Sequence, residues 1–361
     1  MSHISAKLLL YLSACILLFQ CAAHASDNWH VSATPAVIAT DFPFTNGNVH
    51  LAGTLYLPVS GEHLPAVVAL HAALVSARDA ALYRHLREAL PAMGIAVLLY
   101  DRRGSGGSSG DLGTSDYDAL ASDAVAGQRA LATVPRIDHR KIGFWGLSQG
   151  GWLALLAASS SPNAAFAVVV SAPLVSPEKQ MQFATANLLM VRGYPESAVK
   201  NMLDARKAWA DYMHGNTSRE AAAAALRQVE TQPWFDLAFL PKASELPTRP
   251  ENNRWRREMD TDPLVAIRKI KVPLLFLYGG ADPWVPVAQS VDQLRILAAE
   301  RPRITYAVVP DASHEMMFRT QEKMEYDAAS LSQGYPQSPE YFMVMASWLT
   351  RVAVLSESGI W

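Results

Sequence analysis

The chain has 361 residues, half of them hydrophobic, and a formal net charge of −2. A chain of this length buries a large core, and its near-neutral charge provides no global field toward nucleic acid or an anionic membrane. We found no long basic run and no zinc-type spacing of Cys and His. We therefore expect no nucleic-acid partner and no metal site.

The first 25 residues have the pattern of an export signal. Lys7 gives a basic start, residues 8–23 are apolar, and residues 23–25 (Ala-His-Ala) match an A-x-A cleavage site. The apolar run is shorter than the about 20 residues that a spanning helix needs. We therefore expect cleavage after Ala25 and a periplasmic or secreted mature protein without a membrane span.

The same segment also resembles a bacterial lipoprotein box at residues 12–15 (Leu-Ser-Ala-Cys), which would place a lipid anchor on Cys15. We favour cleavage after Ala25, because a mature lipoprotein usually begins with a polar tether, whereas residues 16–19 are apolar. Both cysteines, Cys15 and Cys21, lie in this segment. Its removal would leave no thiol, which excludes a cysteine nucleophile.

Strand and helix patterns alternate along the first part of the mature chain. Two strands are predicted around Pro35–Phe42 and Val49–Leu57, with Asn46-Gly47 as the turn between them. Four short apolar runs then predict buried strands: Pro65–His71, Ile95–Tyr100, Lys141–Leu147 and Phe166–Val170. Helices are predicted over Asp79–Ala92, Tyr117–Val134 and Gly151–Ser159. This alternation indicates an α/β fold with a mostly parallel, doubly wound sheet.

Residues 176–262 interrupt this alternation with a helical, proline-broken pattern that includes a predicted helix at Glu220–Glu230. The sheet pattern then resumes with the elements Val272–Tyr278, Val287–Ala299, Ile304–Val309 and Tyr341–Val352, read as strand, helix, strand and helix. We therefore predict a core over residues 26–175 and 263–361, with residues 176–262 as a helical cap inserted before the last two strands.

Ser148 is the candidate nucleophile, in the sequence Gly-Leu-Ser-Gln-Gly of residues 146–150. The motif joins a predicted strand to a predicted helix, where a sharp turn presents the serine above the sheet. Residues 106–110 (Gly-Gly-Ser-Ser-Gly) match the same pattern around Ser108, but they lie in a Gly/Ser-rich loop. The strand-to-helix context selects Ser148.

A serine nucleophile needs a base, and the base needs an acid that orients it. In strand-turn-helix sites the partners follow in the order Ser, acid, His. Asp282 and His314 come just after the strands predicted at Val272–Tyr278 and Ile304–Val309, where ligands gather in parallel sheets. We therefore predict Asp282 as the acid and His314 as the base, with Asp311 as a rival acid that more often shapes the loop.

An oxyanion hole needs two backbone N–H groups. Gln149, the residue after the nucleophile, is expected to supply one of them. The other is expected from the loop after the strand Pro65–His71, with Ala73 as the best donor and Ala72 as the second.

Together these residues resemble the α/β-hydrolase superfamily over nearly all of the mature chain. Three features resemble bacterial esterases of the dienelactone-hydrolase and prolyl-oligopeptidase-like branch. They are residues 101–104 (Asp-Arg-Arg-Gly), Asp262-Pro263 ahead of residues 270–273, and residues 280–282 (Gly-Ala-Asp) ahead of Val285-Pro286. The resemblance implies acyl transfer to water without metal or cofactor, and a structural role for Asp101. Many relatives have a glycine where this chain has Ala72.

The cap and the segment after His314 are expected to line the substrate pocket, with Met316, Met317 and Trp234 as candidates. No arginine pair is placed for a charged substrate, so we predict small to medium, mostly neutral acyl esters as substrates. The alternatives are a prolyl-oligopeptidase-like peptidase or amidase, an acyltransferase with the same triad, and a non-catalytic binding protein on the same scaffold. The predicted triad argues against the last.

Overall fold

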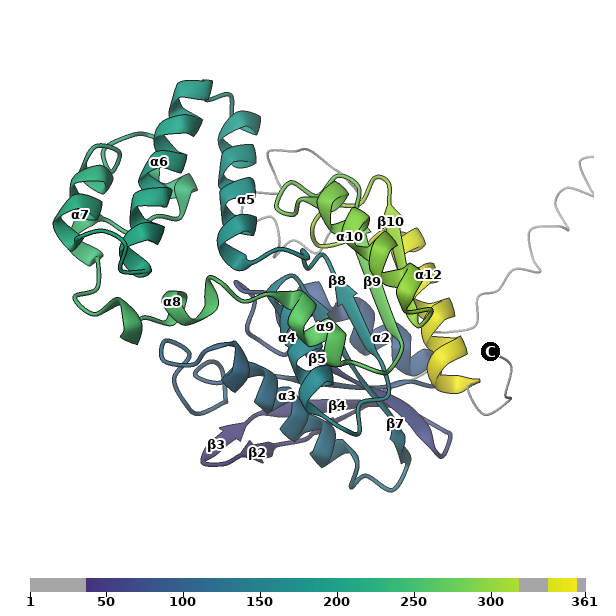
Figure 1. Cartoon of the computed structure of the whole chain (residues 1–361). Coiled ribbons are helices and arrows are strands. Elements are labelled where there is room, and N and C mark those ends of the chain that lie inside the picture. Colours follow the sequence, from purple (N-terminus) through teal and green to yellow (C-terminus); the bar gives the residue numbers. More distant parts are fainter. Residues whose placement is uncertain (1–36, 318–336, 356–361) are drawn as a thin grey trace, which may run out of the picture. The chain divides into compact units, whose positions relative to one another are not determined.

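The computed structural model describes residues 37–317 and 337–355. The predicted signal segment, with Cys15, Cys21 and Ala25, lies outside the described residues. An eight-stranded sheet has the order β1-β4-β6-β5-β7-β8-β9-β10, and β2 and β3 form a separate two-stranded sheet (Figure 1). The strands are β1 (Val37–Asp41), β2 (Phe44–Asn46), β3 (Val49–Leu51), β4 (Gly53–Pro58), β5 (Leu64–Leu70), β6 (Ala96–Tyr100), β7 (Ile137–Leu147), β8 (Ala167–Val170), β9 (Leu274–Gly279) and β10 (Ile304–Val309).

The six strands from β6 to β10 in the sheet order run parallel, whereas β1 and β4 are antiparallel to their neighbours. Every residue of β5 is buried. Because side chains alternate along a strand, Ala66, Val68 and Leu70 pack on one face of the sheet and Val67 and Ala69 on the other. Both faces are thus covered, which confirms the predicted doubly wound α/β sheet.

The helices divide between these two faces. One face packs against α3 (Tyr117–Leu131), α4 (Gln149–Ser160), α9 (Pro263–Lys269) and α10 (Val287–Glu300). The other face packs against α2 (Arg84–Ala92) and α12 (Pro339–Leu349). The 3-10 helix η1 (Ala81–Tyr83) precedes α2, and the π-helix η6 (Thr350–Val354) follows α12. None of the described helices combines the length and the apolar character that crossing a bilayer requires.

The single strand predicted at Val49–Leu57 is wrong, because the segment forms two strands in different sheets. β3 pairs with β2 through a turn at Gly47-Asn48, one residue beyond the predicted Asn46-Gly47, and β4 pairs with β1 and β6. The break is at Ala52, whose N–H donates to Ser108 Oγ and whose carbonyl accepts from the Asp101 N–H. Both backbone groups of Ala52 are therefore bound to a loop, and the strand is interrupted there.

A helical segment lies between β8 and β9, as predicted for the cap. It comprises α5 (Pro177–Val191), α6 (Glu196–Met213), α7 (Arg219–Arg227), η2 (Phe235–Ala238), η3 (Ala243–Glu245), η4 (Pro250–Asn252) and α8 (Arg254–Glu258). α6 packs against both α5 and α7 (Figure 1). This segment has its own hydrophobic cluster, which includes Met202, Leu226 and Trp234.

A buried ion pair holds the cap helices together. Arg206 of α6 is only 1% exposed; its Nη1 lies 3.7 Å from Glu178 Oε2 of α5, and its Nη2 donates to the Ala238 carbonyl. Removing one member of such a pair leaves an uncompensated buried charge, which is more costly than losing an exposed pair. α5, α6 and η2 therefore depend on one guanidinium.

Replacing Arg206 by Met should lower the free energy of unfolding by about 3–5 kcal/mol, because Glu178 is left buried without its charge partner. Lys207→Met is the matched control, since Lys207 is exposed and forms its ion pair with the half-buried Asp211 of the same helix. It should cost less than about 1 kcal/mol. Urea unfolding followed by tryptophan fluorescence measures both, and equal losses would contradict the role of Arg206.

Candidate active site

Ser148 lies in a sharp turn between β7 and α4. Its φ of 56° and ψ of −120° are strained for a residue with a side chain. The turn is fixed on both sides, because Ser148 N–H donates to the Val170 carbonyl of β8 and the Ser148 carbonyl accepts from Gly151 N–H, both at 2.8 Å. The backbone thus holds this serine at the carboxyl end of β7.

The two glycines of the motif are required by close backbone contacts. A Cβ atom on Gly146 would lie 1.9 Å from the Gly150 carbonyl oxygen, and one on Gly150 would lie 2.3 Å from the Leu70 carbonyl oxygen. These atoms belong to the backbone and cannot rotate away. The spacing of the motif therefore follows from the packing of the turn against α4 and β5.

Ser108 of the second motif has a structural environment. Its hydroxyl donates to the Asp101 carbonyl at 2.6 Å and accepts from Ala52 N–H at 2.9 Å. The Asp101 carboxylate accepts from the N–H groups of Arg78 and Gly107, both at 2.9 Å. Ser108 and Asp101 thus brace the loop that follows β6.

Asp282 and His314 are brought together by the loops after β9 and β10. His314 Nδ1 lies 2.8 Å from Asp282 Oδ2. Asp282 Oδ1 accepts from the N–H groups of Trp284 and Val285, at 2.8 and 3.1 Å. Each carboxylate oxygen therefore has its own partners, which sets the direction in which the carboxylate faces the imidazole.

The two loops are joined by backbone contacts. Gly280 N–H donates to the Val309 carbonyl at 2.7 Å, and Ala281 N–H donates to the Ala312 carbonyl at 3.1 Å. A Cβ on Gly279 would lie 2.2 Å from the Ser313 carbonyl oxygen, so only glycine fits there. The side chains of Asp282 and His314 thus lie on a rigid double loop at the same edge of the sheet as Ser148.

Two other histidines, and the rival acid Asp311, have other partners or positions. His214 of the cap pairs with Asp260 at 2.8 Å, and His85 Nε2 lies 3.1 Å from the Tyr341 hydroxyl. Burial lowers the pKa of His85 to about 3, so it stays neutral at physiological pH. Asp311, the rival acid, is exposed in a turn. Asp282 is therefore the acid whose hydrogen bond to His314 the structure shows.

The loop after β5 distinguishes the two candidate oxyanion donors. Ala72 N–H donates to the Tyr83 hydroxyl at 3.0 Å and is therefore occupied. Ala73 N–H has no hydrogen-bond partner within the described part of the chain, and the same holds for Gln149 N–H at the start of α4. Ala72, the second candidate from the sequence, is therefore not available as an oxyanion donor.

The three predicted pocket residues lie in packed interiors. Met316 and Met317, 1% and 6% exposed, belong to the core cluster around α2 and α12. Trp234 is 3% exposed and belongs to the cluster inside the cap. We correct their assignment from substrate contact to packing, because their apolar surface is already covered by neighbouring side chains.

Trp284, which the sequence analysis did not identify, lies near His314, and Phe239 of the cap lies near Trp284. The Trp284 ring centroid is 6.5 Å from that of His314, and the Phe239 ring of the cap is 5.8 Å from that of Trp284. Phe239 is 47% exposed and has a left-handed backbone with φ of 50°. The only sequence signal was that Trp284 follows Asp282 by two residues.

The cap is also attached to the acid loop by polar contacts. From α5, Gln180 Nε2 donates to the Trp284 carbonyl at 3.0 Å and Asn187 Nδ2 donates to the Pro283 carbonyl at 2.9 Å. The surroundings of His314 thus combine core loops with one cap helix.

Burial raises the pKa of Glu315, the residue after His314. The His314 charge opposes this increase in pKa, and the Asp282 charge adds to it.

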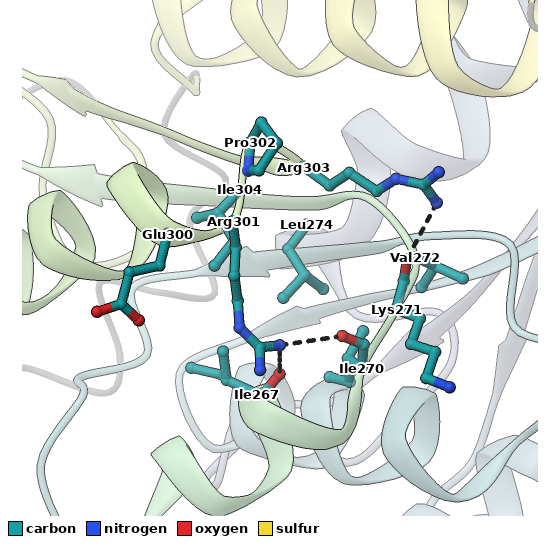
Figure 2. Close-up of a pocket in the computed structure, with 10 residues that line it drawn as sticks. All are labelled: Ile267, Ile270, Lys271, Val272, Leu274, Glu300, Arg301, Pro302, Arg303 and Ile304. Carbon is teal, nitrogen blue, oxygen red and sulfur yellow. Dashed lines mark hydrogen bonds between the residues drawn. The ribbon is translucent and has the colours of Figure 1, made fainter.

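A separate pocket of about 310 Å³ lies at the opposite edge of the sheet, where β9 and β10 begin (Figure 2). Arg301 Nη1 donates to the carbonyls of Ile267 and Ile270 at 3.0 and 3.3 Å, and Arg303 Nη1 donates to the Lys271 carbonyl at 3.1 Å (Figure 2). These guanidinium groups cap the end of α9 and fix the chain entering β9. The pocket is remote from Ser148.

Solved structures share this fold at low sequence identity. An esterase from Pyrococcus furiosus is 19% identical with a TM-score of 0.54, and the match covers 90% of this chain and 95% of that chain. An α/β-hydrolase from Penicillium sp. is 19% identical with a TM-score of 0.53, covering 88% and 99%. An acylaminoacyl peptidase from Pyrococcus horikoshii is 16% identical with a TM-score of 0.54, covering 88% and 42%.

Sequence comparison gives a shorter and a longer match. An uncharacterized protein of Mycobacterium tuberculosis is 33% identical over 132 residues, which are 37% of this chain and 44% of the relative. The match thus spans less than half the length of that curated relative. The family model described as serine aminopeptidase, S33, matches residues 63–321. Because this model covers more than half of the sequence, including the turn at Ser148 and the Asp282–His314 pair, the chain belongs to the S33 serine aminopeptidase family of α/β-hydrolases.

Proposed function

We propose that the protein hydrolyses small to medium acyl esters through Ser148, His314 and Asp282, with an acyl-enzyme intermediate. The observation that carries the proposal is the hydrogen bond between His314 Nδ1 and Asp282 Oδ2 at the sheet edge where Ser148 is held in its strained turn. A nucleophile, a base and an orienting acid at strand ends are the arrangement that acyl transfer requires.

In this mechanism His314 Nε2 accepts the Ser148 proton as the serine oxygen attacks the ester carbonyl. Asp282 holds Nδ1–H and stabilises the imidazolium that forms. The tetrahedral oxyanion receives hydrogen bonds from the N–H groups of Gln149 and Ala73. His314 then returns the proton to the leaving alcohol, and water releases the acyl group from Ser148 by the same steps.

Apolar acyl groups are favoured by the aromatic residues beside the base. Phe239 is exposed next to Trp284, which in turn neighbours His314. Transfer of an apolar acyl chain from water onto these rings is favourable by about 25 cal/mol per Å² of buried surface. The esterase among the structural neighbours is consistent with this substrate class.

Peptide or amide hydrolysis is the second candidate, because the family model is that of a serine aminopeptidase and one structural neighbour is an acylaminoacyl peptidase. Parallel assays on p-nitrophenyl esters and aminoacyl p-nitroanilides separate the two. A kcat/KM for an anilide above that for every ester would replace the esterase proposal by this one.

The variant Ser148→Ala should lower kcat on p-nitrophenyl butyrate by about 10⁶-fold, because the nucleophile is removed. Ser108→Ala is the matched control from the second motif. It should keep kcat within a few-fold of wild type and lose about 1–2 kcal/mol of stability with its two hydrogen bonds. Labelling by a fluorophosphonate probe should be lost only in Ser148→Ala; the reverse pattern would refute the proposed nucleophile.

Exchange of Asp282 for Asn should lower kcat by about 10⁴-fold. The amide group in place of Oδ2 would donate toward His314 Nδ1, which leaves the imidazole proton on Nε2, where the Ser148 proton must go. Asp311→Asn, in the same loop region as His314, should leave kcat unchanged because Asp311 is exposed in a turn. Steady-state kinetics decide, and a larger loss in Asp311→Asn would reassign the acid.

Export remains a proposal from the sequence: we propose cleavage after Ala25 and release into the periplasm or medium. Intact-mass measurement of the mature protein should give a chain that begins at Ser26, because the A-x-A pattern ends at Ala25. A diacylated chain that begins at Cys15 would instead establish the lipid anchor.

A further inference from the structure

We propose that Arg102, together with Tyr83, is a positioning residue that aims the Ala73 N–H into the oxyanion site by holding three consecutive carbonyls of the loop 71–73. The inference rests on the acyl transfer at Ser148 proposed above.

Arg102 lies in the loop after β6 and is only 3% exposed. Its Nη2 donates to the carbonyls of His71 and Ala72, both at 2.8 Å, and its Nη1 donates to the carbonyl of Ala73 at 3.3 Å. The planar guanidinium has five N–H donors in a rigid fork, so one side chain can serve three acceptors in fixed directions. Arg102 therefore turns three successive carbonyls toward itself.

These hydrogen bonds from Arg102 determine the direction of the Ala73 N–H. In a trans peptide the N–H is directed opposite to the carbonyl of the preceding residue, and no cis peptide is found. With the Ala72 carbonyl turned toward Arg102, the N–H of Ala73 in the same peptide plane faces away from Arg102. Arg102 thus fixes the direction of the Ala73 N–H without contacting that group.

Tyr83 removes Ala72 N–H from the candidate donors of this loop. The Tyr83 hydroxyl accepts from Ala72 N–H at 3.0 Å and donates to the Val75 carbonyl at 3.1 Å. Burial raises the pKa of Tyr83, which keeps the hydroxyl protonated and able to donate. Ala72 N–H is therefore occupied, and Ala73 N–H has no partner in residues 37–317 and 337–355.

The loop begins against the helix that follows the nucleophile. A Cβ on Gly150 would lie 2.3 Å from the Leu70 carbonyl oxygen and 2.8 Å from the His71 carbonyl oxygen. The backbone at the end of β5 therefore touches the first turn of α4, where Gln149 N–H is the other proposed donor. The carbonyl groups that Arg102 binds, those of residues 71–73, begin at this contact.

The charge of Arg102 has no acidic partner that would explain its burial. Its neighbour Arg103 pairs with Asp123 through two hydrogen bonds, whereas the described residues place no carboxylate within salt-bridge distance of Arg102. A buried charge is costly unless it is compensated. The carbonyls of the loop provide that compensation, so the loop and the guanidinium hold each other in place.

The test compares Arg102→Met, Arg102→Lys and Tyr83→Phe with the control Tyr341→Phe. Tyr341 is a buried tyrosine of the same core cluster, and its hydroxyl contacts His85 and Met345 instead of the loop. For each folded variant, the concentration of active sites is titrated with a fluorophosphonate. Then kcat, KM, the pH profile of kcat, and the inhibition constant of an alkylboronic acid, which forms a tetrahedral adduct, are measured.

Arg102→Met should lower kcat per active site by about 100-fold with KM nearly unchanged, since small displacements of a donor act on the transition state. Tyr83→Phe should lower it by about 10-fold, and Arg102→Lys should fall between Arg102→Met and wild type because it keeps one charged donor group. Boronic acid affinity should fall in parallel, while the pH profile stays unchanged because the His314–Asp282 pair is intact.

Three results are decisive. If kcat per active site in Tyr83→Phe and in the folded Arg102 variants equals that of Tyr341→Phe, the positioning role is refuted. A loss of kcat without loss of boronic acid affinity would refute it as well. Turnover by wild type and by Ser148→Ala is measured first. If wild type shows no Ser148-dependent turnover, the proposed function fails and the Arg102 variants are not compared.

Discussion

Backbone-to-backbone contact at the carboxyl edge of the parallel sheet is the constraint on which the rest of the site depends. Gly150 lies against the Leu70 carbonyl, and Gly279 lies against the Ser313 carbonyl, at distances that exclude a Cβ. The first contact joins the end of β5 to the turn after β7, and the second joins the end of β9 to the loop after β10. The proposed catalytic groups then need only short loops to meet, and short loops are stiff.

The cap is joined to this edge through few but specific interactions. Gln180 and Asn187 of α5 donate to carbonyls of the acid loop, and Phe239 meets Trp284. The cap is otherwise organised around its own cluster and the buried Arg206. The cap thus combines a core of its own with polar contacts to the loops at the edge of the sheet.

The sequence predicted those elements that depend on interactions between residues close together in the chain. Apolar runs gave the buried strands because both faces of the sheet are covered, and the strand-to-helix turn predicted at Ser148 is present. The strand predicted at Val49–Leu57 was wrong because Ala52 is bound to the distant residues Asp101 and Ser108. Met316 and Met317 were misassigned because position near His314 in the chain does not reveal which side chains pack inward.

The sequence by itself determined the fold class, the cap between β8 and β9, and the order of Ser148, Asp282 and His314, because periodicity and strand-end position are properties of the chain. Only the tertiary structure decided that Asp282 contacts His314, that Ala72 N–H is taken by Tyr83, and that Arg102 holds the loop 71–73. These choices depend on the directions of hydrogen bonds between segments far apart in the chain, and no spacing along the sequence encodes a direction.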